Sequence, residues 1–222
     1  MIQTIIFDLA EVLVAGMHGV ERRLAHRLGI AEEGLLRKLG GDVFLNLMRG
    51  KVTEEAYLAW AIETYGWDIR HDEVKQMVRD NFRHEVPGTA GLVSELAGHF
   101  ELALLTDHGR EWMAHIIAVH PFLSLFDHVF TSYDLGRIKT DPGTFDVVLH
   151  ALGRAPGDCL FIDDNPANID SARATGIDAI LFESAAQLRA ELAQRGVLAA
   201  EAGQHRYRVT DIGYDVESHP DT

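Results

Sequence analysis

The sequence predicts an α/β protein in which a doubly wound, Rossmann-like parallel sheet is interrupted by an inserted, all-helical cap domain. Three observations predict this fold. Short, continuously apolar runs recur along the chain, helical patterns separate the later runs, and about ninety residues without a convincing strand follow the first run. Continuous apolar strands are typical of a parallel sheet covered on both faces. Their alternation with helices indicates the doubly wound arrangement.

The expected strands are short runs rich in apolar and β-branched residues. They are too short for typical helices, and their continuous apolar character indicates burial on both faces of a sheet. In chain order these runs are Thr4–Leu9, Glu101–Thr106, His128–Ser132, Asp158–Asp163 and Asp178–Phe182.

The expected core helices carry apolar residues at helical spacing between and around the later strands. Pro142 and Pro166 suit a first helical turn, where the missing N–H of proline costs nothing, and Asp141 and Asn165 are the expected N-caps. The segments are Thr89–His99, Arg110–Val119, Pro142–Leu152, Pro166–Thr175 and Ala185–Gln194.

The long interval after the first strand reads as a helical insert folded over the sheet. Gly16 and the Pro87–Gly88 turn bound it. We therefore expect a core domain of residues 1–15 and 86–200, a cap domain of residues 16–85 and a polar extension of residues 201–222. The expected cap helices are Val20–Leu28, Glu32–Leu39, Val43–Met48, Glu54–Tyr65 and Asp72–Phe82.

The composition restricts the partners and the location. The chain has 20 Lys and Arg residues against 34 Asp and Glu residues, a formal charge of −14, which argues against a nucleic-acid partner. Its apolar runs are too short to span a bilayer, and its N-terminus lacks the basic region of a secretory signal, so we expect no membrane partner. Cys159 is the single cysteine and is expected in the core. A cytoplasmic monomer or homodimer is the expectation.

Polar side chains are expected to gather at one edge of the sheet. Ligands of open α/β sheets bind at the carboxyl ends of the strands. Asp8, Thr106 and the pair Asp163 and Asp164 stand at such ends, and Lys139 follows the third strand. A single aspartate at a strand end would mean little, because helix caps are common. The convergence of several polar residues predicts a site.

The chemistry of this set favours phosphoryl transfer. Three neighbouring carboxylates cannot all stay ionised without a cation, which implies a hard divalent metal such as Mg²⁺. The Thr106 hydroxyl and the Lys139 ammonium group would hold the remaining oxygens of a phosphoryl group. An aspartate beside the metal would attack phosphorus and form an aspartyl-phosphate that water later hydrolyses. The residues thus predict a Mg²⁺-dependent enzyme acting on a small phosphorylated molecule.

Four segments in order resemble the motifs of the haloacid dehalogenase superfamily, and the resemblance covers roughly residues 1–195. The fourth is the most specific, because its paired aspartates, Asn-Pro turn and following helix fit the family along their length. A stretch at 49–60, RGKVTEEAYLAW, also resembles the caps of phosphatase-like members. The four segments are FDLAEVLV (7–14), LLTDHG (104–109), GRIKTDPGTFDVVL (136–149) and FIDDNPANIDSARATGI (161–177).

The resemblance implies a role for each matching position. It makes Asp8 the nucleophile, Thr106 the hydroxyl that holds the transferred phosphoryl group, and Lys139 the cation that steadies it. The metal ligands it implies are Asp8, Asp164 and Asp163, with Asp163 either a ligand or a support. Asn168 and Asp170 stand where the family often orients the lysine or the metal-bound waters.

One position departs from the family pattern. Phosphatases of the family usually carry a second aspartate two residues after the nucleophile, and this aspartate protonates the leaving group and then activates water. Ala10 stands there instead, although its backbone carbonyl can still be a metal ligand. Glu11, Asp107 and His108 are the candidates for supplying the proton. The residues expected to contact the substrate are Glu11, His18, Thr106, Asp107, His108 and Lys139.

Two other functions stay open at this point. A 2-haloacid dehalogenase would use the aspartate to displace halide without a metal. The pair Asp163 and Asp164 argues against it, because a metal-free site gains nothing from additional negative charge. The other alternative is a weakly active or catalytically impaired binding or regulatory protein, and Ala10 is its only support.

Overall fold

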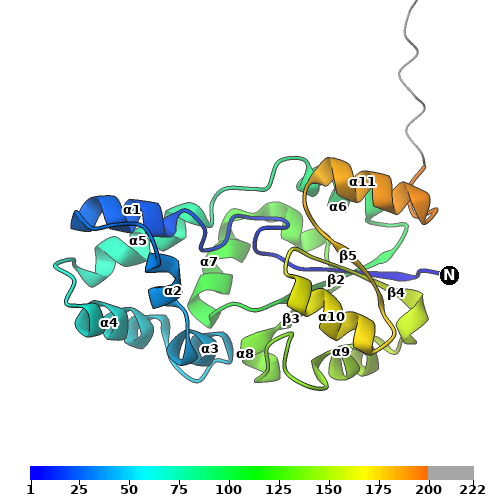
Figure 1. Cartoon of the computed structure of the whole chain (residues 1–222). Coiled ribbons are helices and arrows are strands. Elements are labelled where there is room, and N and C mark those ends of the chain that lie inside the picture. Colours follow the sequence, from blue (N-terminus) through cyan, green and yellow to red (C-terminus); the bar gives the residue numbers. More distant parts are fainter. Residues whose placement is uncertain (200–222) are drawn as a thin grey trace, which may run out of the picture.

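The computed structural model describes residues 1–199, and within them the chain forms a five-stranded sheet of order β3-β2-β1-β4-β5 (Figure 1). Every neighbouring pair of strands is parallel. The predicted fold class is confirmed. The predicted polar extension, residues 201–222, lies outside the described residues. The strands are β1 (Thr4–Phe7), β2 (Glu101–Thr106), β3 (His128–Thr131), β4 (Cys159–Asp163) and β5 (Asp178–Leu181).

Helices cover both faces of the sheet, as the continuously apolar strands require. Successive residues of β1 show the division: Ile5 and Phe7 belong to one hydrophobic core, whereas Ile6 between them belongs to the other. The first core packs against α6 (Thr89–Leu96), α7 (Arg110–Val119) and α11 (Ala185–Gln194). The second packs against α9 (Thr144–Leu152) and α10 (Pro166–Ala174). Shorter connecting elements are α8 (Ser132–Leu135) and the 3₁₀ turns Pro121–Leu125 and Pro156–Asp158.

The segment after β1 is helical, as predicted, and lies beside the sheet domain (Figure 1). The chain enters and leaves it through two adjacent segments: Ala15 N donates to His84 O at 2.8 Å, and Val86 N donates to Leu13 O at 2.9 Å. The predicted domain boundaries fall at these segments and stay a prediction. The cap helices are α1 (Val20–Leu28), α2 (Leu35–Leu39), α3 (Asp42–Met48), α4 (Glu54–Tyr65) and α5 (His71–Asn81).

Two predicted helix starts are wrong. Helix α2 begins at Leu35, after Gly34 in the left-handed conformation at φ 74°, and not at Glu32. Helix α9 begins at Thr144, after Gly143 in the left-handed conformation at φ 77°, and not at Pro142. Asp141 is therefore not its N-cap, because its carboxylate has other partners: it accepts from the Ile138 backbone N–H at 3.0 Å and pairs with an arginine of the cap. The other predicted cap is confirmed, since the Asn165 side chain accepts from Ala167 N at 3.0 Å at the start of α10.

Polar contacts fix the cap against the core. Arg49 donates from Nη2 and Nε to the two carboxylate oxygens of Asp141 at 2.6 and 2.9 Å. Close by, Ser132 Oγ donates to Met48 O at 2.6 Å. The cap therefore meets the core at the loop that carries Lys139. Within residues 1–199, the helices are too short or too polar to cross a membrane.

Candidate active site

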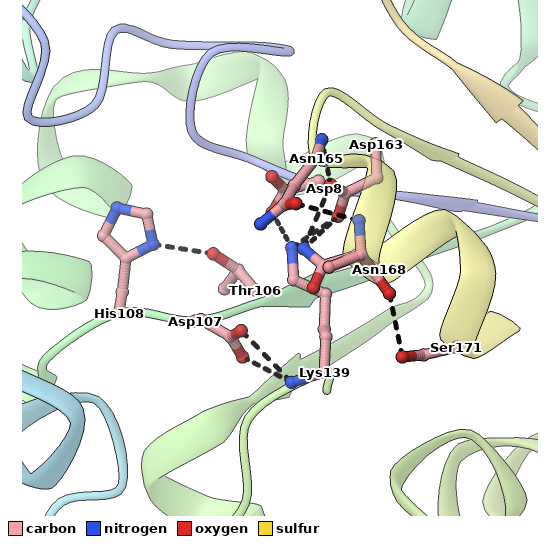
Figure 2. A network of polar contacts seen from close by, with 10 residues as sticks. Asp8, Thr106, Asp107, His108, Lys139, Asp163, Asn165, Asn168 and Ser171 are labelled. Carbon is pink, nitrogen blue, oxygen red and sulfur yellow. Dashed lines mark hydrogen bonds and ion pairs between the residues drawn. The ribbon is translucent and has the colours of Figure 1, made fainter. Parts of the chain in front are cut away.

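The site lies where three adjacent strands end. Asp8 directly follows β1, Thr106 is the last residue of β2 and Asp163 is the last residue of β4. Because β1 lies between β2 and β4, the topology brings these three residues to one edge of the sheet, as the sequence predicted. Figure 2 shows their side chains converging with that of Lys139.

Lys139 joins two of the carboxylates. Its Nζ lies 2.6 Å from Asp8 Oδ1 and 2.7 Å from Asp163 Oδ2, and all three residues are buried. Burial by itself would lower the pKa of Lys139, but Asp8, Asp163 and Asp107 together raise it above its usual value. The lysine therefore stays charged, and it has hydrogen-bonding geometry toward both carboxylates.

Helix α10 holds Asp163 from the other side. Asn168 Nδ2 lies 3.0 and 3.1 Å from its two carboxylate oxygens, and Asn165 N donates to Oδ1 at 2.8 Å. Asn168 thus contacts Asp163, and Lys139 is held through that carboxylate.

Asp170 is exposed. Two residues along an α-helix turn the side chain by about 200°, so Asp170 faces away when Asn168 faces the site. The expectation that Asp170 orients the lysine or the metal waters is not supported.

The carboxylates form a cluster that fits a divalent cation. Asp8, Asp163 and Asp164 each offer one carboxylate oxygen, and these oxygens lie within 4.8 Å of one another. Burial raises the pKa of Asp8 well above its usual value, and burial followed by the charge of Asp163 raises that of Asp164. A bound cation would stabilise the ionised forms, and a set of hard oxygen donors suits Mg²⁺.

Thr106 and His108 form a buried pair. Thr106 is fully buried, and its Oγ1 lies 2.7 Å from His108 Nδ1 (Figure 2). Burial, with the charge of Lys139, lowers the pKa of His108 to about 3, so the imidazole is neutral near pH 7. The hydroxyl therefore has a fixed neighbour at the end of β2.

The other two acid–base candidates differ in what they contact. Both carboxylate oxygens of Asp107 accept from the backbone N–H of Lys139, at 3.2 and 3.1 Å, so this residue holds the lysine loop. Glu11 Oε1 accepts from Gly16 N at 2.9 Å, which leaves Oε2 without a hydrogen-bond partner among residues 1–199. Glu11 has a φ of 59°, an uncommon conformation for a residue other than glycine.

These groups face a cavity of about 620 Å³ between cap and core. Thr106 and Asp163 lie behind its lining, whereas the other predicted site residues line it. The apolar side of the cavity was not predicted from the sequence, because periodicity does not show which cap side chains face the sheet. The apolar and aromatic lining residues are Met17, Phe44, Leu45, Met48, Phe82, Trp112 and Ile138.

The chain is similar in sequence to two curated enzymes. It is 29% identical over 156 residues to flavin mononucleotide hydrolase 1 of Arabidopsis thaliana, a match that spans 70% of this chain and 62% of the relative. It is 24% identical over 200 residues to D-ribitol-5-phosphate phosphatase of Bacteroides thetaiotaomicron, across 86% of this chain and 97% of the relative.

Solved structures share the fold. A HAD family enzyme from Bacteroides thetaiotaomicron, in complex with magnesium and inorganic phosphate, superposes with a TM-score of 0.70 at 17% identity, over 83% of this chain and 96% of that chain. L-2-haloacid dehalogenase from Xanthobacter autotrophicus superposes with a TM-score of 0.63 at 19% identity, over 89% and 85%. At such identities the similarity of these structures is evidence for the fold alone.

The family comparison agrees with the order of the four motifs and with the strand ends that carry them. Residues 2–176 match the family described as haloacid dehalogenase-like hydrolase. This range includes all of the strand-end residues described above. The chain therefore belongs to the haloacid dehalogenase-like hydrolases.

Proposed function

We propose that the protein is a Mg²⁺-dependent phosphatase of small phosphate monoesters that acts through an aspartyl-phosphate at Asp8. One observation carries the proposal: Asp8 lies against Lys139 at 2.6 Å and shares a divalent-cation cluster with Asp163 and Asp164. One curated relative is a flavin mononucleotide hydrolase and another is a D-ribitol-5-phosphate phosphatase, and a similar solved structure holds magnesium and inorganic phosphate. These similarities support this choice.

The chemistry proceeds in two displacements. A carboxylate oxygen of Asp8 forms a bond to phosphorus while the bond between phosphorus and the ester oxygen breaks, and the leaving oxygen takes a proton. Water then attacks the same phosphorus and gives a proton to the group that protonated the leaving oxygen, while the bond between phosphorus and the Asp8 oxygen breaks. This step releases inorganic phosphate and regenerates the Asp8 carboxylate. Lys139 and the Thr106 hydroxyl would hold the phosphoryl oxygens during both steps. A Mg²⁺ ion held by Asp8, Asp163, Asp164 and the Ala10 carbonyl would neutralise the charge of the phosphoryl group.

We assign Glu11 as the proton donor. It takes the place of the aspartate that phosphatases of the family usually carry at the position of Ala10. Its carboxylate lines the cavity one residue after Ala10, and one of its oxygens has no hydrogen-bond partner among residues 1–199. Asp107 has both oxygens on the Lys139 backbone, and the neutral His108 contacts Thr106. His108 and His18 would instead contact the substrate, since both line the cavity.

The decisive experiment is turnover of 4-nitrophenyl phosphate with Mg²⁺ by the wild type and by Asp8→Asn. We expect Asp8→Asn to be inactive, because an amide does not displace the ester oxygen. Asp134→Asn is the matched control, since Asp134 is an exposed acid outside the cavity. Wild-type turnover equal to that of Asp8→Asn would contradict the proposal and leave a binding or regulatory protein.

Chelation distinguishes the phosphatase from a dehalogenase. The similarity to L-2-haloacid dehalogenase in fold makes this the second candidate. EDTA should abolish phosphatase activity, and added Mg²⁺ should restore it. Release of chloride from 2-chloropropionate that persists in EDTA would instead show a dehalogenase, which needs no metal.

A further inference from the structure

Seven large apolar side chains line the cavity, and Lys139 is the only lysine or arginine in that lining among residues 1–199. We infer that the site selects phosphate monoesters whose leaving group is uncharged and presents a broad apolar or aromatic face. This inference rests on the proposed phosphatase function and adds the chemical class of the substrate.

Three aromatic residues, called the aromatic wall, form one part of the cavity lining. Phe44 comes from the cap, Phe82 from the segment that returns to the core, and Trp112 from α7. The ring centroids of Phe44 and Trp112 are 6.1 Å apart, and those of Phe82 and Trp112 are 5.4 Å apart. The rings therefore pack together as one cluster built from both domains. Because Phe82 and Trp112 are buried, with 0% and 1% of their surfaces exposed, the partly buried ring of Phe44 is the part of this wall against which an apolar group can pack.

A buried acid of the cap fixes the centre of this wall. The indole N–H of Trp112 donates to Glu54 Oε1 at 2.9 Å, and Arg79 holds the other oxygen of Glu54 at 2.7 Å. Glu54 has only 1% of its surface exposed. Because this bond uses the only donor of the indole, Trp112 is held in a fixed orientation and supports the ring of Phe44 beside it. A preformed wall binds a rigid ligand without paying for side-chain ordering.

The charges of the cavity argue against a second anionic group. Among the lining residues within 1–199, Lys139 is the only lysine or arginine, and its Nζ is already bonded to Asp8 and Asp163. The lining also includes the carboxyl groups of Glu11, Asp107 and Asp164. A carboxylate or second phosphate on the leaving group would lose its water and meet like charges with no cation to pair with. The leaving group that fits is neutral.

A pair of isosteric esters tests the charge argument. We propose to compare 4-carbamoylphenyl phosphate with 4-carboxyphenyl phosphate, which differ by one charge and little in shape, in the presence of Mg²⁺. The expected kcat/KM is at least tenfold higher for the amide. Similar values for the two esters, or a preference for the carboxylate, would overturn the inference while leaving the phosphatase function intact.

Leu45 provides a gain-of-function version of the same test. It is a half-buried residue of α3 that lines the cavity, so a long cationic side chain has room to reach solvent. Leu45→Arg should reduce the preference for the neutral ester at least fivefold, and Leu45→Gln is the matched uncharged control. An unchanged preference in Leu45→Arg would contradict the electrostatic basis of the selection.

The apolar wall has its own variants. Phe44→Ala should lower the ratio of kcat/KM for 1-naphthyl phosphate to that for glycerol 2-phosphate at least fivefold, and Phe44→Leu should retain most of it. Phe130→Ala is the matched control, because Phe130 is a partly buried phenylalanine of β3 outside the cavity. A ratio unchanged in Phe44→Ala would overturn the role of the wall.

A binding measurement separates this inference from the proposed function. If no ester turns over, the phosphatase proposal fails. Isothermal titration calorimetry with Mg²⁺ and benzylphosphonate, with or without a 4-carboxylate, then decides the inference by itself. We expect at least tenfold weaker binding of the carboxylated phosphonate, and equal affinities would overturn the inference.

Discussion

The hydroxyl of Thr106 lies 2.7 Å from Nδ1 of His108, and both residues are buried at the end of β2. The imidazole is neutral, because burial lowers its pKa to about 3. The neutral ring therefore carries one proton, on Nδ1 or on Nε2. Which nitrogen carries it decides whether the Thr106 hydroxyl donates to Nδ1 or accepts from it. The two side chains act as one unit at the position proposed to hold a phosphoryl oxygen.

The buried neutral histidine predicts how stability changes with pH. Below the ordinary pKa of about 6.5 the unfolded chain binds a proton at His108 that the folded protein does not, so folding stability falls as the pH drops. From pH 7.5 to pH 5 this one group removes about 2 kcal/mol. His108→Gln should lack that loss, which urea unfolding at the two pH values measures.

An exposed histidine provides the control for this measurement. His26→Gln removes a side chain that is exposed on α1 and should keep the wild-type dependence on pH. If His108→Gln and the wild type lose the same free energy of unfolding between the two pH values, His108 is not the source of the pH dependence.

Lys139 predicts a link between stability and Mg²⁺. Lys139→Met leaves Asp8 and Asp163 buried without their cation, which should destabilise the protein by about 3 kcal/mol and abolish turnover. The cluster then carries one more uncompensated negative charge, so it should bind Mg²⁺ more tightly. We expect Mg²⁺ to raise the melting temperature of Lys139→Met more than that of the wild type. Lys51→Met, at an exposed lysine, is the control, and equal responses to Mg²⁺ in all three proteins would contradict the prediction.

Gly50 predicts how closely the cap must approach the core. It follows α3 at φ 69°, and a Cβ there would lie 2.9 Å from Tyr133 Cβ and 3.1 Å from Tyr133 O. Gly66 has a similar φ of 60°, but a Cβ there meets nothing within 4 Å. Gly66→Ala should therefore cost about 1 kcal/mol for the left-handed backbone alone. Gly50→Ala should cost more and lower kcat/KM, because the cap must move away from Tyr133. Equal losses in urea unfolding would show that this contact adjusts freely.

The sequence predicted the sheet and the meeting of several candidate site residues at one edge for a single topological reason. Parallel strands end at a common edge, so Asp8, Thr106 and Asp163 could be placed together once the strands were located. The ends of the elements depend on tertiary contacts and were less predictable. Asp141 has the residue type and position of an N-cap, but an arginine from the cap pairs with it and the helix begins later.

The apolar side of the site was not predictable, because it depends on how the cap packs against the core. Phe44, Phe82 and Trp112 are distant in the sequence and read individually as core residues. Their packing into one cluster depends on contacts such as the hydrogen bond from Trp112 to Glu54, which no periodicity reveals. Asp170 shows a different limit: the family motif pointed to this residue, but its side chain is exposed and helix geometry turns it away from the side that Asn168 presents to the site.

Ala10 predicts a gain of function that depends on the leaving group. Its side chain lines the cavity two residues after Asp8, where an aspartate would face the ester oxygen. Ala10→Asp should raise the rate by about 10²-fold for an alkyl phosphate, because a positioned general acid contributes about that much or more. An aryl phosphate needs less protonation as its bond breaks, so its rate should rise much less.

Ala10→Asn, which has the same size without the acid, is the control for packing. The space beside Ala10 is tight, because a Cβ added at Gly16 would lie 3.1 Å from Ala10 Cβ. Steady-state rates for both esters measure the effect. An equal gain in Ala10→Asn, or equal gains for both esters, would show that the added carboxyl group does not act as the acid.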